Sequence, residues 1–419
     1  SDWESLVSQA FSLTGKKEGI TLYIHLPFCE SLCTYCGCNK RITKNHQVED
    51  SYLEAIFREW SHYLALFEET PKIAGIHLGG GTPTFFSPQN LELSISKILK
   101  SAEISPSFEF SFEGHPNNTT FEHLEELAQL GFDRVSYGIQ DFDPEVQKAI
   151  HRIQPFEKVK EATDNARKLG YQSVNFDLIY GLPLQTLATL KETFGRVSEL
   201  KPDRIAFYSY AHLPSAFPAQ KSFEAFLPSE QEKRALYDFG KEMLLQMGYE
   251  EIGMDHFALP NDPLCEAKRS GNLHRNFMGY TTSPSEMLIG LGASSISDIG
   301  LGFAQNEKNI EIYEQSLKEN RLTMIRGHIQ TEEDKLIRMV IMDLICRGKA
   351  DVPYSIWEKL PFESLLALFE MEDEGLIQRD GLAVSVTSMG MAVVRNICAQ
   401  FDLRMISSKS QKAQFSKAI

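Results

Sequence analysis

Short runs of branched and aromatic residues alternate with longer segments of helical periodicity, and this alternation constrains the fold more than any other feature. The runs are Thr21–Leu26, Ile73–Leu78, Phe108–Phe112, Arg134–Ile139, Ser173–Ile179 and Arg204–Tyr210. The helical segments are Asp50–Phe67, Pro88–Ala102, Phe121–Leu130, Phe156–Leu169 and Leu190–Leu200. Strands separated by helices favour right-handed β–α–β units and a parallel sheet. Six strands are too few for a closed eight-fold barrel, so the sequence predicts an α/β fold with a partial (β/α)6 TIM-like barrel.

The predicted strands all end in polar or glycine-rich residues. These residues are Cys29–Cys38 after the first strand, Gly79–Pro83 after the second, Glu113, Gln140 and Asp177 at the next three, and Tyr210–His212 at the sixth. Barrel enzymes carry their chemistry at the C-terminal ends of the strands. We therefore expect one site at these strand ends.

The cysteines are distributed unevenly. Of seven, four lie within ten residues, at Cys29, Cys33, Cys36 and Cys38, and the others are scattered singly. A secreted disulfide framework would space its cysteines more widely and would suit a smaller chain. The clustering indicates metal binding in a reducing compartment, so we expect a cytoplasmic protein. The lone residues Cys265, Cys346 and Cys398 are predicted to be buried as small apolar side chains.

Cys29, Cys33 and Cys36 place three thiolates on one short loop. A cubane iron–sulfur cluster usually takes four cysteine ligands, so a group of three can leave one iron open to a further ligand. Zinc is the alternative. Structural zinc usually takes four ligands, and Cys38 could supply the fourth.

Composition excludes several classes of function. The formal net charge of −15 argues against nucleic acid as a partner. No segment has 18 consecutive apolar residues, so no membrane association is expected. The first residues, Ser1–Glu4, lack the basic and apolar regions of a signal peptide.

The pattern changes after about residue 328. Predicted helices cover Thr331–Cys346, Tyr354–Lys359, Phe362–Glu374 and Ser388–Cys398, with a hairpin formed by 375–378 and Leu382–Val386. Helices with a small hairpin resemble a winged-helix module, but this region carries no strong basic run, so a lid or packing role is favoured over DNA binding. The predicted parts are an N-terminal segment (1–20), a catalytic domain (21–328) and a mainly helical C-terminal domain (329–419).

The cysteine spacing CxxxCxxC after the first strand resembles the radical S-adenosylmethionine (SAM) superfamily. Further motifs narrow the resemblance to the family of oxygen-independent coproporphyrinogen III oxidases, also called dehydrogenases. They are Leu22–Cys29, Cys36–Lys40, Gly79–Thr84, Gly138–Phe142, Asp177–Pro183, Tyr210–Pro214, Gly253–Ala258 and Leu273–Phe277. Cys38 and the His-Arg-Asn-Phe stretch at 274–277 are more specific than the three cysteines alone. The resemblance runs from about residue 20 to the C-terminus.

The resemblance implies a [4Fe–4S] cluster on Cys29, Cys33 and Cys36 and two SAM molecules. Residues implied at the first SAM are Tyr23, Gly80, Glu113 and Ile296. Residues implied at the second are Tyr35, Gly81, Thr82, Gln140, Arg152, Asp177 and Ala211. Cys38 matches a cysteine that does not bind iron, and a catalytic role is expected for Tyr23, His25 and Cys38.

The implied reaction converts two propionate side chains of coproporphyrinogen III to vinyl groups in haem biosynthesis. It gives protoporphyrinogen IX, consumes SAM and uses no O2. A SAM-derived radical takes hydrogen from the propionate β-carbon, and loss of CO2 and one electron then forms the vinyl group. The implied partners are a low-potential electron donor and an electron acceptor, and the expected state is a monomer.

The sequence departs from the family pattern in three places. The N-terminal segment that closes over the active site is not recognised, Met278 stands where glutamine is usual beside the second SAM, and Gly114-His115 replaces the usual pair after Glu113. Two alternatives therefore stay open. One is a related haem chaperone, although such proteins carry His-Asn-x-x-Tyr-Trp where this chain has His274–Tyr280. The other is a radical SAM methyltransferase acting on a porphyrin.

Overall fold

The predicted strand–helix alternation is confirmed by a computed structural model, which describes residues 2–407. The six predicted strands are β1 (Ile20–Leu26), β4 (Lys72–Gly80), β5 (Glu103–Gly114), β6 (Arg134–Gln140), β7 (Ser173–Tyr180) and β8 (Arg204–Ser209). β1 pairs in parallel with β4, β4 with β5, and β5 with β6. All seven residues of β1 are buried, as expected for a strand covered on both faces of a parallel sheet.

The chain divides into two compact units. The first contains the described residues up to Asp177, with Glu199–Pro202 and Ser283–Ile329. The second contains Leu178–Ser198, Asp203–Thr282 and the described residues from Gln330 onward. The division falls inside β7.

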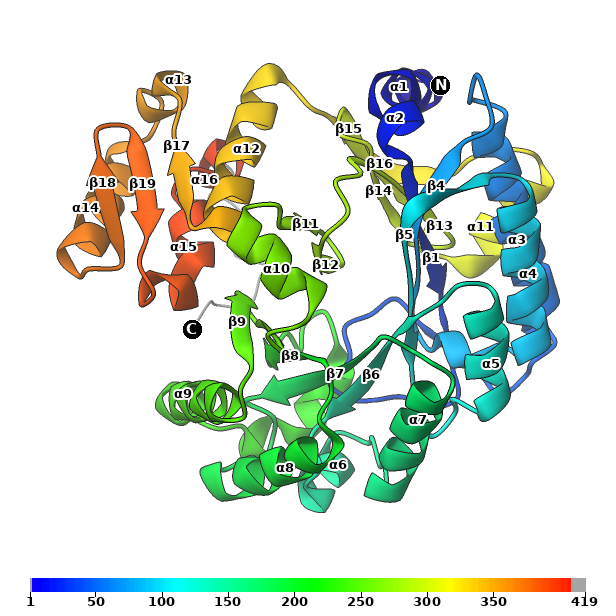
Figure 1. Ribbon diagram of the computed structural model, residues 1–419, viewed down its shortest axis with the longest axis horizontal. Coiled ribbons are helices and arrows are strands. Elements are labelled where there is room, and N and C mark those ends of the chain that lie inside the picture. Colours follow the sequence, from blue (N-terminus) through cyan, green and yellow to red (C-terminus); the bar gives the residue numbers. More distant parts are fainter. Residues whose placement is uncertain (1, 408–419) are drawn as a thin grey trace. The chain divides into compact units, whose positions relative to one another are not determined.

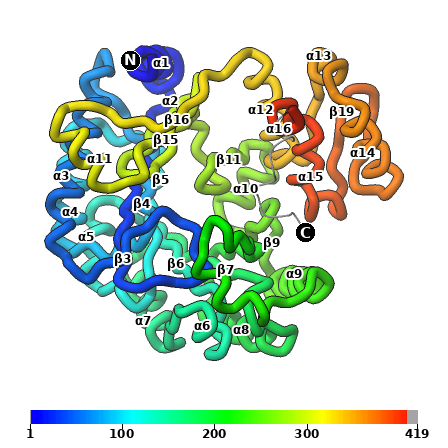
Figure 2. Tube along the Cα trace, turned by 180° about the vertical axis from the view of Figure 1, so that it is seen from behind, coloured from blue at the N-terminus to red at the C-terminus, as the bar shows by residue number. Residues whose placement is uncertain are grey.

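In the first unit, helices lie outside the strands, as the views from both sides show (Figures 1 and 2). They are α3 (Val48–Leu64), α4 (Pro88–Lys100), α5 (Phe121–Gln129) and α7 (Phe156–Lys168), with the shorter α6 (Pro144–Ala149). α4 packs beside α3 and α5, and α5 also packs against α7. Local capping fixes where they begin: Ser87 accepts a bond from the Asn90 amide before α4, and Thr120 forms a capping box with His123 before α5.

Four further strands extend this sheet on the β1 side and were not predicted. They are β13 (Met287–Leu291), β14 (Ile296–Asp298), β15 (Gly302–Asn306) and β16 (Met324–Ile329). β13 pairs in parallel with β1, and the other three continue antiparallel, which makes the sheet mixed. The segment predicted at 1–20 contains α1 (Asp2–Ala10), a π-helical turn (Phe11–Gly15) and α2 (Lys16–Glu18), while α11 (Ile310–Lys318) packs against α3.

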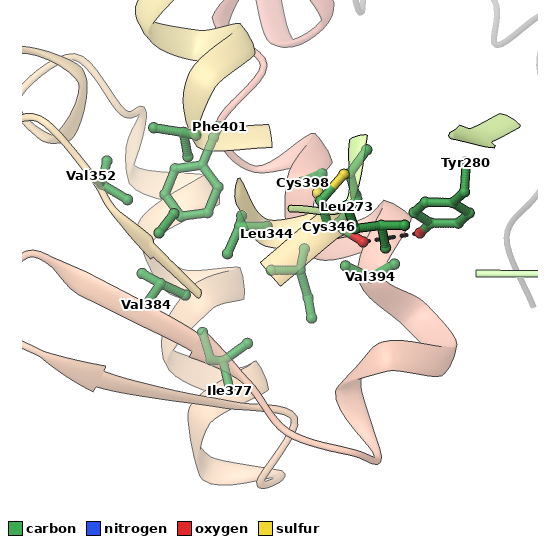
Figure 3. Close-up of a cluster of buried hydrophobic side chains, with 14 of the residues drawn as sticks. Leu273, Tyr280, Leu344, Cys346, Val352, Ile377, Val384, Val394, Cys398 and Phe401 are labelled. Carbon is green, nitrogen blue, oxygen red and sulfur yellow. Dashed lines mark hydrogen bonds between the residues drawn. The ribbon is translucent and has the colours of Figure 1, made fainter. Parts of the chain in front are cut away.

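The second unit builds a separate apolar core (Figure 3). Its elements before residue 283 are α8 (Leu187–Leu200, mostly in this unit), α9 (Glu230–Gln246), β9 (Glu250–Gly253), β10 (His256–Ala258), α10 (Pro263–Ser270), β11 (His274–Asn276) and β12 (Gly279–Thr281). Its later helices are α12 (Glu332–Arg347), α13 (Tyr354–Trp357), α14 (Phe362–Asp373), α15 (Val394–Ala399) and α16 (Leu403–Ser407). The core joins both stretches, because Leu273 and Tyr280 are buried together with Leu344 and Val384.

The C-terminal region is mainly helical, as predicted, and differs from the prediction locally. β17 (Lys349–Asp351) joins the predicted hairpin strands β18 (Ile377–Asp380) and β19 (Ala383–Val386) in a three-stranded antiparallel sheet. The predicted helix Ser388–Cys398 is confirmed only from Val394 onward, as α15, because Gly390–Val393 form a 3-10 turn and Val393 has a non-helical φ of −118°. The winged-helix comparison and the boundary at 328/329 stay predictions. Among the described residues, no helix is long and apolar enough to cross a membrane.

Candidate active site

The four clustered cysteines lie on a loop whose two ends are fastened together. β1 leads through Pro27 into β2 (Phe28–Cys29), and β2 pairs in parallel with β3 (Arg41–Ile42). The amide of Arg41 donates to the carbonyl of Pro27 at 2.8 Å, and the amide of Thr43 donates to that of Cys29 at 2.9 Å. The loop between Cys29 and Arg41 therefore leaves and rejoins the same place at the end of β1.

Polar groups surround the thiols of this loop. The Thr82 hydroxyl donates to Cys29 Sγ at 3.3 Å, and Arg152 Nη1 donates to Cys33 Sγ at 3.4 Å. A hydrogen bond from the Cys38 thiol, helped by the charge of Lys40, lowers the pKa of Cys36 to about 6. Burial raises the pKa of Cys29 to about 11. Donors aimed at sulfur stabilise thiolates and tune the potential of a bound iron–sulfur cluster, so this set fits a cluster.

Among residues 2–407, no group of three or more His, Cys, Asp or Glu side chains is arranged around one metal ion. This finding does not bear on a cubane cluster, because each of its cysteines binds a different iron.

A cavity of about 330 Å3 opens beside the cysteine loop. Cys29, Cys33 and Cys36 line it together with Tyr35, Gly81, Thr82 and Arg152, four residues expected at the second SAM. Other lining residues include Lys40, Lys44, His115, Asn117, Asn118, His151 and Ile153. Its size is that of a small-molecule site. Lys44 and His151 were not predicted, because no motif distinguishes them from other surface residues.

The glycines at the end of β4 permit close approach of the neighbouring loop. A Cβ on Gly81 would lie 2.7 Å from the Pro27 carbonyl group, and one on Gly80 would lie 2.7 Å from the His25 ring. Gly80 also has a φ of +114°, which side-chain-bearing residues rarely adopt. The glycines therefore hold β4 against the start of the cysteine loop, and their binding of SAM stays a prediction.

Tyr23 and His25, both on β1, are joined by a hydrogen bond. The Tyr23 hydroxyl donates to His25 Nδ1 at 3.1 Å, and His25 Nε2 donates to the Asn39 carbonyl at 2.9 Å. This tautomer follows because a carbonyl oxygen only accepts. Burial lowers the pKa of His25, which keeps its ring neutral.

Glu113 is held by His77, which no sequence motif predicted. His77 Nε2 lies 3.3 Å from Glu113 Oε1, and His77 Nδ1 lies 2.8 Å from the Ser111 hydroxyl. The Gly80 amide donates to Glu113 Oε2 at 3.4 Å. His77 and Ser111 are partners in the β4–β5 register, so the pairing of the strands places them together. The alternation of Ser111 and Glu113 on one strand was the available signal.

Gln140, Arg152 and Asp177 come from the next strand ends. Arg152 is anchored by bonds from Nη2 and Nε to the Gly138 carbonyl at 2.7 and 3.1 Å. Gln140 has a strained φ of +67°, and its buried Oε1 has no hydrogen-bond partner among the described residues. A strained residue with an unsatisfied buried oxygen is typical of a binding site and fits a ligand that donates a hydrogen bond there. Burial raises the pKa of Asp177 to about 6, although Asn175 and Ser136 donate to it.

The two remaining predicted residues, Ile296 and Ala211, belong to different units. Ile296 begins β14, in the first unit. Ala211 follows β8 in the second unit, and its carbonyl accepts a bond from Gln220 Nε2 at 3.2 Å. His115, noted as a departure, lines the cavity as a neutral ring, since burial and the charge of Arg152 lower its pKa to about 2.

An α/β barrel with three cysteines on the loop after its first strand defines the class of radical SAM proteins, and residues 23–197 match the family model described as the radical SAM superfamily. Within that class, the chain belongs to the family of oxygen-independent coproporphyrinogen III oxidases. It is 40% identical to the oxidase of Escherichia coli K12 over 96% of this chain and 89% of that protein. It is 37% identical to the oxidase of Synechocystis, with the same two coverages.

A solved structure agrees with this assignment. The structure of coproporphyrinogen III oxidase (HemN) from Escherichia coli, described as a radical SAM enzyme, matches this chain with a TM-score of 0.89 and 38% identity. The match covers 96% of this chain and 93% of that one. The predicted fold class and the predicted cofactors, a [4Fe–4S] cluster and SAM, are therefore confirmed at the level of the family.

Proposed function

We infer that this chain is the oxidoreductase that decarboxylates coproporphyrinogen III without O2, converting two propionate side chains to vinyl groups in haem biosynthesis. The observation that carries this inference is the fastened cysteine loop beside a cavity, in a chain that shares 40% identity with an oxygen-independent coproporphyrinogen III oxidase over nearly its whole length. When bound, the cluster and SAM supply a 5′-deoxyadenosyl radical that takes hydrogen from the β-carbon of a propionate. Loss of CO2 and one electron completes each vinyl group.

Each group of residues has a proposed task. Cys29, Cys33 and Cys36 hold three irons, and Cys38, which is exposed, stays free of iron and serves turnover. Glu113, fixed by His77 and the Gly80 amide, presents a carboxylate to the amino group of the first SAM, with Tyr23 and Ile296 at the same molecule. His25 keeps Tyr23 in place through their hydrogen bond.

The second SAM is proposed to lie in the cavity lined by Tyr35, Gly81, Thr82 and Arg152. Arg152 brings a positive charge to this cavity, which suits a carboxylate ligand. Gln140 Oε1, unsatisfied and buried, is available to accept a hydrogen bond, and Asp177 and Ala211 complete the proposed set.

We propose further that the enzyme works as a monomer in the cytoplasm, with neither nucleic acid nor a membrane as a partner. The thiols of the cysteine loop require a reducing compartment. A low-potential donor reduces the cluster, and a separate acceptor removes the electron released with CO2. Residues 329–419 are proposed to serve as a lid that keeps water from the radical.

The test is an anaerobic assay with reconstituted protein, coproporphyrinogen III, SAM and a chemical reductant, read by mass spectrometry. The expected product has lost two CO2, and the Cys33→Ala variant forms none. A matched control, Cys398→Ala, changes a buried cysteine of the second unit and keeps activity. A methylated porphyrin would instead identify a methyltransferase, and stable haem binding without turnover would identify a chaperone.

A further inference from the structure

The His-Arg-Asn-Phe stretch that distinguishes this sequence has no place in the site described above. It forms β11, which pairs with β12 so that Arg275 lies opposite Tyr280. The Arg275 guanidinium lies over the Tyr280 ring, with its central carbon 4.6 Å from the ring centroid. Its Nη1 atom is buried and has no hydrogen-bond partner among the described residues.

The Tyr280 ring that supports Arg275 is fixed in the second unit. The Tyr280 hydroxyl donates to the carbonyl of Ile345 at 2.9 Å (Figure 3). A Cβ at Gly253 would lie only 2.4 Å from that hydroxyl, so the glycine makes room for it. Arg275 is therefore presented by a rigid support, as a binding group has to be.

Positive charge exceeds negative charge around Arg275. Arg395 pairs with Asp255 at 2.5 Å, and Arg275 acts on the same carboxylate. Another arginine nearby, Arg204, has its own partner in Asp262 at 2.7 Å. Two guanidinium groups thus share one carboxylate, which leaves a site for a further anion.

A second unsatisfied group lies in the same place. The His256 ring is enclosed edge-on by Tyr280 and Tyr208, with centroids 5.4 and 5.8 Å away. Its Nδ1 atom is buried without a hydrogen-bond partner among the described residues. Burial and the charge of Arg275 lower its pKa to about 3, so the ring is neutral and carries a single proton.

Buried donors without acceptors are costly, and native proteins supply partners for nearly all of them. The arginine fork matches the two oxygens of a carboxylate. We propose that Arg275, with His256 beside it, binds a propionate carboxylate of the tetrapyrrole substrate. The proposal rests on the proposed function, since it assumes a substrate with propionate side chains. The carboxylate of SAM has the same chemistry, and the experiment separates the two.

The probes are coproporphyrin III, its tetramethyl ester and SAM, each titrated anaerobically into the cluster-containing full chain. In the Arg275→Gln variant, the dissociation constant for coproporphyrin III is expected to rise about 10- to 100-fold, the effect of losing a charged hydrogen bond. The ester should bind the parent and the variant equally, and SAM affinity should not change. Arg275→Lys keeps the positive charge but not the two-pronged guanidinium. Its dissociation constant for coproporphyrin III should lie between those of the parent and Arg275→Gln.

Arg269→Gln is the matched control, because Arg269 is an exposed arginine of the same unit, paired with Glu250. Circular dichroism and cluster absorbance verify that each variant is folded. If coproporphyrin III binds the parent and Arg275→Gln alike, the proposal is overturned while the proposed function stands. Loss of SAM binding alone would also overturn it, by assigning the arginine to SAM. If the parent binds no coproporphyrin III, the proposed function fails together with the inference.

Discussion

The same side chain has two different environments in the two units of this chain. Cys29, Cys33 and Cys36 are partly buried on a loop, where Thr82, Arg152 and Lys40 bring hydrogen bonds or charge to them. Cys346 and Cys398 are buried in the apolar core of the second unit (Figure 3), and burial raises the pKa of Cys398 to about 12.

The comparison shows that surroundings determine what a cysteine can do. A thiol in an apolar core stays protonated and behaves as a small hydrophobic group, whereas a donor and a cation beside Cys36 lower its pKa and favour the thiolate form that binds iron. The predicted burial of Cys265, Cys346 and Cys398 is confirmed.

The largest expected effect separates these two environments. Cys33→Ala, like Cys29→Ala or Cys36→Ala, should abolish the iron–sulfur absorbance, because the cluster loses one of three protein ligands. Cys398→Ala should keep that absorbance and cost about 1 kcal/mol of unfolding free energy. Iron content and visible spectra of anaerobically reconstituted protein check this. If Cys33→Ala and Cys398→Ala lose iron equally, the loop cysteines do not differ from the core cysteines in binding the cluster.

Cys38 sharpens the comparison within the loop itself. Cys38→Ala should keep the cluster but impair turnover, since the resemblance assigns Cys38 no iron. Cluster spectra and product formation, measured on one preparation, separate the two properties. If Cys38→Ala loses iron as completely as Cys33→Ala, the set of ligands is wrong.

A buried carboxylate of the first unit gives a pH test. Glu59 is 1% exposed and accepts bonds from Tyr313, Asn306 and the Gly292 amide. Burial raises its pKa to about 7 from 4.5, so its contribution to stability is greatest at low pH and is lost as pH rises toward 7. Between pH 5 and pH 8 the free energy of unfolding of the parent should fall by about 2–3 kcal/mol relative to that of Glu59→Gln.

Denaturant unfolding of both proteins at the two pH values measures this difference. If the unfolding free energies of the parent and Glu59→Gln differ by the same amount at pH 5 and at pH 8, the pKa of Glu59 is not raised by folding. The burial of this carboxylate in the first unit would then cost little.

The smallest effect concerns Met278 in the second unit. Glutamine offers a donor and an acceptor, and methionine only a weak acceptor. Met278→Gln should therefore tighten SAM binding at the second site several-fold to about tenfold, the worth of one hydrogen bond, and leave the first site unchanged. Anaerobic equilibrium binding measures both sites. One SAM per chain in both proteins would contradict the two-site interpretation.

The sequence predicts those parts of the fold whose signals are local. Arg134–Ile139 and Ser173–Ile179 are branched runs between helical segments, and they match β6 and β7 to within one residue at each end. β14 and β15 were not predicted because they have only three and five residues. A segment this short does not show a recognisable alternation of apolar and polar residues. The divided helix before Cys398 depends on one backbone angle, at Val393, which its side chain does not reveal.

In the candidate site, too, some features could be predicted from local sequence and others depend on the tertiary fold. The spacing of Cys29, Cys33 and Cys36 is local, so the cluster could be predicted from it. The support of Glu113 by His77 depends on the register of β4 and β5, and strand register is a property of the tertiary fold. The unsatisfied Nη1 of Arg275 likewise becomes visible only when its neighbours are known.

The central claim is that a SAM-derived radical takes hydrogen from the propionate β-carbon. The most direct measurement uses coproporphyrinogen III carrying deuterium at that carbon, with the reconstituted full chain, SAM and a reductant. Mass spectrometry of the 5′-deoxyadenosine formed should show one deuterium gained, together with loss of CO2 from the porphyrinogen. Decarboxylated product accompanied by unlabelled 5′-deoxyadenosine would contradict the account.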